Sequence, residues 1–236
     1  MAALEITDDR SEFDWRAGLP RLANDRVLLR PLRRSDAPGL YRVVRSSEVA
    51  RQMWPPPNSV QAFERFIEWT LTEGAAGRYI CFGIVPRGQT KAVGMFELRQ
   101  LQPRFFRAEL GFFLASSWWG TGVFSSAAGL LLNFATDVLR VHRIEARTSI
   151  DNARGNAALR KIGAKKEGIL RGAFMRDGQY IDQNLWGFLA GCDGCTDAIA
   201  GSSGAIRGAE RLKVPAKGPR PSRAMRHTLL ADRDAH

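Results

Sequence analysis

The chain has 236 residues, of which 44% are hydrophobic and 25% charged, a balance typical of a globular protein with one sizeable core. No run of about 18 apolar residues is present, which excludes a membrane-spanning helix, and the acidic first residues lack the apolar centre of a secretory signal. We therefore expect a cytoplasmic protein. The net charge of +11 favours polyanionic partners, such as a ribosome surface, RNA or cofactor phosphates.

The N-terminal part of the chain predicts two helices behind a short strand. Residues 1–25 read as an irregular leader, and residues 26–32 alternate as a strand does. A serine cap then opens a helix over 35–45. Residues 52–58 hold a tryptophan and three prolines, which exclude regular structure and leave either a rigid connector or one wall of an acceptor groove. A second helix is expected over 59–73, with its aromatic residues on one face.

The middle of the chain predicts three consecutive strands followed by a glycine-containing loop and an apolar helix. The strands are expected over 79–85, 92–98 and 107–114. The loop covers 118–122, and the helix runs from 123 to 139. This order favours a sheet built mainly from neighbouring antiparallel strands rather than from βαβ units.

The remaining pattern predicts one more strand and helix and then a hairpin. We expect a strand over 143–150 and a helix over 152–162. Strands over 164–173 and 179–189 flank an Asp-Gly turn. The folded domain is thus predicted to span 26–191.

The last 45 residues, 192–236, lose the apolar period and are rich in Gly, Ala, Ser, Arg and Pro. We predict that this basic tail is largely disordered, with contact to RNA or acidic partners as the alternative. Cys192 and Cys195 form a lone C-x-x-C without two further convincing ligands, so we expect no metal site.

The segment most informative for chemistry carries Gly120 and Gly122 between a strand and a helix. Glycines let backbone amides approach an oxyanion closely, and a helix N-terminus adds unpaired N–H groups and a positive dipole end. The sequence therefore predicts a phosphate cradle here, with an ordinary tight turn as the alternative.

This loop and a second segment together resemble the GNAT superfamily of N-acetyltransferases. Family members carry Q/R-x-x-G-x-G/A, here 119–124, followed by N-x-x-S/G-x-x-x-L-x-K-x-G-F/A, here starting at Asn152. The opening V-L-L-R-P-L-R-R-S-D from Val27 and the strand E-L-G-F-F-L are typical of its Rim-type, N-terminal acetyltransferase branch. The resemblance covers about residues 20–190. It implies an α/β GNAT fold: a mixed, mostly antiparallel sheet with splayed central strands, flanked by helices.

Three positions depart from the family pattern. Trp119 stands where Gln or Arg is usual, Phe124 where Ala or Gly is usual, and Gly155 where several relatives carry a serine thought to protonate the departing thiolate. Another group or water must then fill that serine's role.

The resemblance implies acetyl-CoA as co-substrate and places its contacts on the splayed strand, the loop and the following helix. Asn152 has helix capping as an equal alternative. The residues implied are Phe112, Phe113, Leu114, Trp119, Gly120, Thr121, Gly122, Val123, Phe124, Ser125, Asn152 and Asn156.

A carboxylate acting as general base can deprotonate the attacking amine. Glu109 is the first candidate, because it interrupts an apolar strand, and an ion pair with Arg107 or Arg147 is its alternative. Glu97, near the end of the preceding strand, is the second candidate.

The sequence leaves three candidates for what happens at the acceptor side. A protein N-terminal α-amine is expected first, because its pKa near ~8 needs less help than that of a lysine. The alternatives are a small amine, such as an aminoglycoside or polyamine, and a degenerate acyl-CoA-binding or ribosome-associated protein without catalysis.

Overall fold

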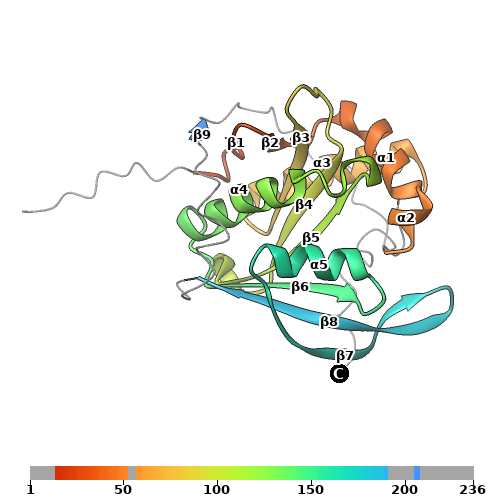
Figure 1. Cartoon of the computed structure of the whole chain (residues 1–236). Coiled ribbons are helices and arrows are strands. Elements are labelled where there is room, and N and C mark those ends of the chain that lie inside the picture. The colour runs from red at the N-terminus through yellow and green to blue at the C-terminus, as the bar shows by residue number, and fades with distance from the viewer. Residues whose placement is uncertain (1–13, 53–56, 191–204, 208–236) are drawn as a thin grey trace, which may run out of the picture.

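A computed structural model describes residues 14–52, 57–190 and 205–207, and these form one nine-stranded sheet with helices on both faces (Figure 1). The strand order is β7-β8-β6-β5-β4-β3-β2-β1-β9. The strands are β1 Arg21–Ala23, β2 Val27–Pro31, β3 Tyr79–Pro86, β4 Gly94–Gln100, β5 Arg107–Leu114, β6 Arg143–Ser149, β7 Lys165–Arg176, β8 Gln179–Leu189 and β9 Ala205–Arg207. The α-helices are α1 Ala37–Arg45, α2 Ser47–Ala50, α3 Val60–Ala75, α4 Val123–Asp137 and α5 Ala153–Lys161.

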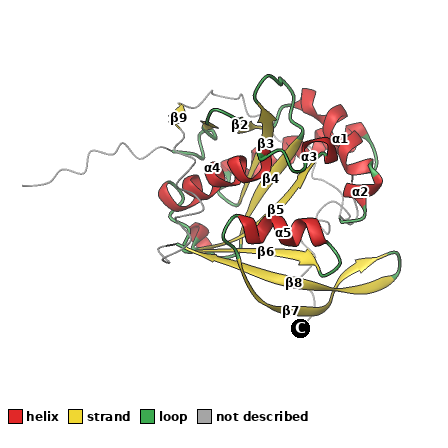
Figure 2. Cartoon of the chain, in the orientation of Figure 1, coloured by secondary structure: helices red, strands yellow, loops and turns green. Residues whose placement is uncertain are grey.

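The sheet is mostly antiparallel, and β5–β6 is the one parallel pair among the described strands. Neighbouring strands β2 to β5 follow each other along the chain, whereas α4 carries the chain from β5 across to β6 (Figure 2). Because such a crossover makes its two strands parallel, β5 and β6 point the same way at the centre of the sheet.

Two hydrophobic clusters cover the two faces of the sheet. On one face, α4 packs on β3 and β4 through side chains such as Phe82, Phe96 and Phe134, and α5 joins the same cluster through Leu159. On the other, α1 and α3 pack through Leu40, Phe63 and their neighbours. All eight residues of β3 are buried because helices cover both of its faces.

Local signals explain where several elements begin. The Ser59 side chain accepts a hydrogen bond from the Ala62 amide at 3.0 Å and caps α3. The predicted start of α1 was wrong by two residues, because Asp36 ends a 3₁₀ turn before the helix. Its buried carboxylate binds the Arg30 guanidinium at 2.8 and 2.9 Å, which joins α1 to β2.

The predicted elements are found with shifts of up to three residues at their ends, whereas β1, α2 and β9 were not predicted. The leader is fixed to the domain by Trp15, which is buried against Phe105 with ring centroids 5.6 Å apart.

In the predicted tail, Ala205–Arg207 pairs with β1. The rest of 192–236 and Trp54 of the proline loop lie outside the described residues, so those predictions and the domain limits stay predictions.

No helix in the described ranges is long and apolar enough to cross a membrane.

Candidate active site

The site lies where the two parallel strands separate. β5 and β6 pair from Arg107 opposite Arg143 to Leu110 opposite Ala146. Beyond that point, β5 continues to Leu114 beside β4 alone, and the end of β6 pairs with β8. The backbone of 111–114 therefore has an edge facing β6 that no strand occupies, which is where a ligand can add hydrogen bonds to the sheet.

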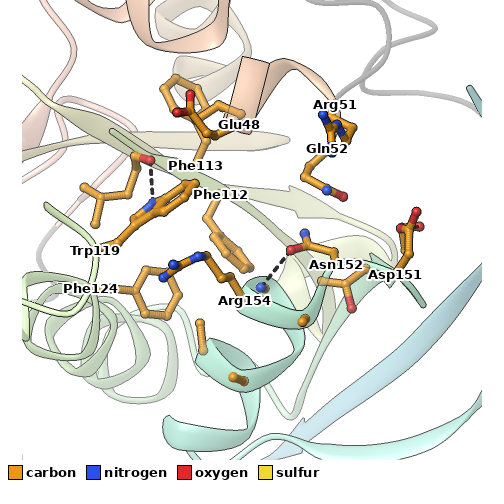
Figure 3. Close-up of a pocket in the computed structure, with 18 of the residues that line it drawn as sticks. Glu48, Arg51, Gln52, Phe112, Phe113, Trp119, Phe124, Asp151, Asn152 and Arg154 are labelled. Atoms are coloured by element: carbon orange, nitrogen blue, oxygen red, sulfur yellow. Dashed lines mark hydrogen bonds between the residues drawn. The ribbon is translucent and has the colours of Figure 1, made fainter. Parts of the chain in front are cut away.

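A pocket of about 590 Å³ fills this opening. The lining comes mainly from the ends of β5 and β6, α2 with the two residues after it, the loop before α4 with the first turn of that helix, and α5 (Figure 3). Phe174 of β7 and Gln183 of β8 complete it. In the close-up, Glu48, Arg51 and Gln52 lie on the side of α2, and Phe124 and Arg154 lie on the side of α4 and α5. The pocket thus reaches from one layer of helices to the other through the gap in the sheet.

The loop before α4 has the backbone that a phosphate cradle needs. The backbone at Gly120 and at Gly122 is in the left-handed conformation, with φ of 77° and 85°, and this conformation favours glycine. Gly122 is the N-cap of the 15-residue helix α4 and offers no side chain to the helix amides. Gly120 lines the pocket, and a Cβ added to it would meet only open space. The loop and the pocket volume therefore fit a diphosphate-containing ligand such as acetyl-CoA.

Phe124 and Trp119, the two bulky departures from the family pattern, form the wall of the pocket without filling it. Phe124 packs against Phe112 and Phe96, with ring centroids at 4.9 and 5.4 Å. The Trp119 indole N–H donates to the Leu114 carbonyl at 2.9 Å, which fixes the ring across the end of β5. Phe124 therefore extends the apolar core to the pocket surface.

The two asparagines have different surroundings. Asn152 lines the pocket and caps α5, because its side-chain oxygen accepts from the Gly155 amide at 2.9 Å. Asn156 is buried behind the pocket. Its Oδ1 accepts from Thr148, Asn184 and Trp186 at 2.6, 2.8 and 3.0 Å, and its Nδ2 donates to two backbone carbonyls. These bonds occupy the polar atoms that we predicted would contact the cofactor, so Asn156 holds α5 against β6 and β8 instead.

The predicted cofactor residues thus fall into two groups. Those brought to the pocket are Phe112, Phe113, Leu114, Trp119, Gly120, Phe124 and Asn152, whereas Thr121, Gly122, Val123, Ser125 and Asn156 do not line it. The first four of this second group belong to the loop and the first turn of α4, next to Gly120. Sequence reasoning missed two parts of the lining. One is α2, which is a single turn, and the other is Arg154, which lies over Trp119, a residue far from it in the sequence.

Neither candidate base lines the pocket: Glu109 lies on β5 and Glu97 on β4. Glu109 forms ion pairs with Arg99 and, at 3.8 Å, with Arg147. Its ion-pair alternative is therefore realised, with Arg99 as an additional partner. Both guanidinium groups engage the Glu109 carboxylate, and Glu109 does not line the pocket, so it is not placed to meet an amine there.

Glu97 is surrounded differently. It accepts a hydrogen bond from the Tyr79 hydroxyl and lies directly opposite Gly111, which lines the pocket. Burial raises the pKa of its carboxyl from 4.5 to about 7, with the Tyr79 hydrogen bond lowering it and the charge of Glu109 raising it.

Burial also raises the pKa of the nearby Cys81 thiol well above its usual value, which makes a thiolate nucleophile unfavourable there.

Comparison with known proteins agrees with this geometry. Residues 26–165 match the acetyltransferase (GNAT) domain family. The Bacillus subtilis protein YoaA, an uncharacterized N-acetyltransferase, is 27% identical over 173 residues, 72% of this chain and 97% of its own. The Escherichia coli [ribosomal protein uS5]-alanine N-acetyltransferase is 25% identical over 73% of this chain and 93% of its own. The E. coli spermidine N(1)-acetyltransferase is 25% identical over 65% and 81%.

Among solved structures, Mycobacterium smegmatis RimJ in complex with CoA-disulfide superimposes with a TM-score of 0.66 at 22% identity, covering 79% of this chain and 95% of that one. This likeness confirms the fold. The family match covers more than half of the chain and includes both motifs that indicated it. The chain therefore belongs to the GNAT family and is an acetyl-CoA-dependent N-acetyltransferase.

Proposed function

We propose that the chain acetylates the α-amine of a protein N-terminus, and that the acceptor enters on the side of α2. The charge of the pocket carries this proposal. Three arginines and two carboxylates line it. Asp151 is paired with Arg176 at 2.5 Å and Arg147 with Glu109 at 3.8 Å, and the other lining charges, Arg51, Arg154 and Glu48, leave no acidic surplus. A polyamine carries several positive charges and needs a surplus of acidic groups, which this lining lacks.

The likeness to the uS5-alanine N-acetyltransferase supports the same acceptor class. The likeness to the spermidine enzyme supports the polyamine alternative, and the two relatives are equally identical to this chain. The lining charge is therefore what separates the two candidates. A target within the ribosome also suits the net charge of +11, because a basic protein is attracted to RNA-rich surfaces.

Glu97 is the general base in this proposal. With a pKa of about 7 it is ionised in a substantial fraction of molecules at neutral pH, and it is basic enough to accept a proton from an ammonium group of pKa near ~8. Gly111 lies between Glu97 and the pocket and places no side chain there. A Cβ at this position would lie only 2.7 Å from Glu97 Cγ, so glycine is what leaves room for the carboxyl group. A water molecule at this glycine is the route by which the proton would reach the carboxylate.

Acetyl-CoA supplies the activated acyl group as a thioester. The free edge of 111–114 would hold its pantetheine arm by backbone hydrogen bonds, and the amides of the loop before α4 would hold its diphosphate. Phe112 and Phe124 contribute an apolar wall that excludes water from this arm.

A direct competition between acceptors tests the proposal. Thiol release from acetyl-CoA is measured with a set of N-terminal peptides, with the same peptides blocked at the α-amine, and with spermidine. The proposal predicts turnover only with free α-amines. Faster turnover with spermidine, or equal turnover with blocked peptides that contain lysine, would assign the enzyme to another acceptor class.

A further inference from the structure

Arg154, which the family pattern does not single out, crosses the pocket from α5 towards the start of α4 (Figure 3). Its guanidinium carbon lies 4.9 Å from the centre of the Trp119 ring. Both residues line the pocket. Since the indole N–H is anchored on the Leu114 carbonyl, the ring is a fixed platform for the guanidinium.

The charge of Arg154 is not neutralised by the protein. Within the described ranges, Arg154 forms no ion pair, although ten other charged pairs are formed there. A cation–π contact with one ring leaves guanidinium N–H groups available for an anion. An aromatic platform thus orients a positive charge beside the pocket and leaves its hydrogen-bonding capacity free.

The loop before α4 lacks a cation of its own. Residues 118–124 read WWGTGVF and contain no lysine or arginine, and Trp119 occupies the position at which the family pattern has Gln or Arg. The left-handed glycines supply amides and the dipole end of α4, but these carry only partial charges. A diphosphate bound here therefore needs a full positive charge from another element. Arg26 approaches the loop, with its Nη1 3.5 Å from where a Cβ on Gly122 would lie, but Arg26 does not line the pocket, whereas Arg154 does.

We propose that Arg154 supplies this charge and binds the diphosphate of CoA, with Trp119 holding its guanidinium in place. The loop residue that the family pattern provides is thus replaced by a pair: a tryptophan in the loop and an arginine on α5. This inference concerns the donor and is independent of which amine accepts the acetyl group.

The same helix offers a matched control. Arg160 is also exposed, lies on α5, and stacks on a tryptophan, Trp186, with its guanidinium carbon 5.9 Å from the ring centre. Neither Arg160 nor Trp186 lines the pocket. Replacing Arg160 removes the same charge from the same helix without touching the site.

Calorimetric titration without acceptor tests the proposal, using CoA, 3′-dephospho-CoA and pantetheine, which has no diphosphate. Arg154→Ala should weaken the binding of CoA and of dephospho-CoA about tenfold to a hundredfold, the range for a lost hydrogen bond to a charged group, and leave pantetheine binding unchanged. Arg160→Ala should change none of the three by more than about twofold. Adding Trp119→Arg to Arg154→Ala should restore much of the lost affinity, since it returns a cation to the loop.

The salt dependence of CoA binding gives a second measurement if pantetheine binds too weakly to titrate. The affinity of the Arg154→Ala variant should fall less steeply with ionic strength than that of the unmodified protein. An unchanged affinity and salt dependence would overturn the proposal, as would an equal loss for pantetheine or for Arg160→Ala. A loss seen with CoA but absent with dephospho-CoA would move the contact to the 3′-phosphate and contradict the assignment to the diphosphate.

Discussion

Replacing Glu97 by glutamine removes the proposed base while keeping its size and its hydrogen-bond acceptor for Tyr79. General base catalysis contributes about 10²–10⁴ in rate, so we expect kcat to fall at least a hundredfold. Binding of CoA should persist, because Glu97 lies behind Gly111 and does not line the pocket. Steady-state thiol release and calorimetry measure the two quantities separately.

The pH profile provides the sharper part of this prediction. A base must be deprotonated, so the rate of the unmodified enzyme should rise with pH through about 7, where Glu97 loses its proton. The Glu97→Gln variant should lack this inflection and keep only that of the acceptor amine near ~8. Glu109→Gln is the matched control: the inflection should survive in it but move to lower pH, because the Glu109 charge that raises the pKa of Glu97 is removed.

A rate within about threefold of normal in Glu97→Gln, together with the inflection near 7, would exclude Glu97 as the base, since a lost base costs far more than that. A large loss in Glu109→Gln without a loss in Glu97→Gln would return the role to the first sequence candidate.

Three further changes test the scaffold around the site. Gly111→Ala should lower kcat about tenfold or more and shift the inflection in the pH–rate profile, because the new Cβ would collide with the Glu97 carboxyl; an unaltered profile would argue against a proton path at this glycine. Asn156→Ala should destabilise the fold by about 3 kcal/mol, since it leaves buried donors without an acceptor, and lower Tm by about 6–12 °C in calorimetry. Arg30→Met leaves the Asp36 carboxylate buried without its guanidinium and should cost about 3–5 kcal/mol in urea unfolding, whereas a cost below about 1 kcal/mol would mean that this pair does not fix α1 to β2.

Much of the fold could be read from the sequence because its signals are local. Alternation and apolar periodicity marked the strands and long helices, and residues such as Ser59 and Asn152 marked helix starts through their own side chains. The 3₁₀ turn before α1 could not be foreseen, because it depends on the buried bond between Asp36 and Arg30 on another element. A one-turn helix such as α2 is too short to show a period.

The site was only partly predictable for the same reason. The loop glycines and the strand residues Phe112 to Leu114 follow from a motif, which fixes positions along the chain. The roles of Glu97 and Glu109 depend on what each side chain meets across the sheet, and sequence alone ranked Glu109 first. Arg154 became a candidate only when the fold brought it over Trp119.

The central claim is that the pocket between β5 and β6 delivers an acetyl group to a protein α-amine. The most direct test is mass-spectrometric mapping of the acetylated position on a peptide that offers both a free N-terminus and an internal lysine, with acetyl-CoA as donor. The account predicts acetylation at the N-terminus and its loss when Glu97 is replaced by glutamine. Acetylation of the lysine instead, or of spermidine alone in a mixture of the two acceptors, would contradict it.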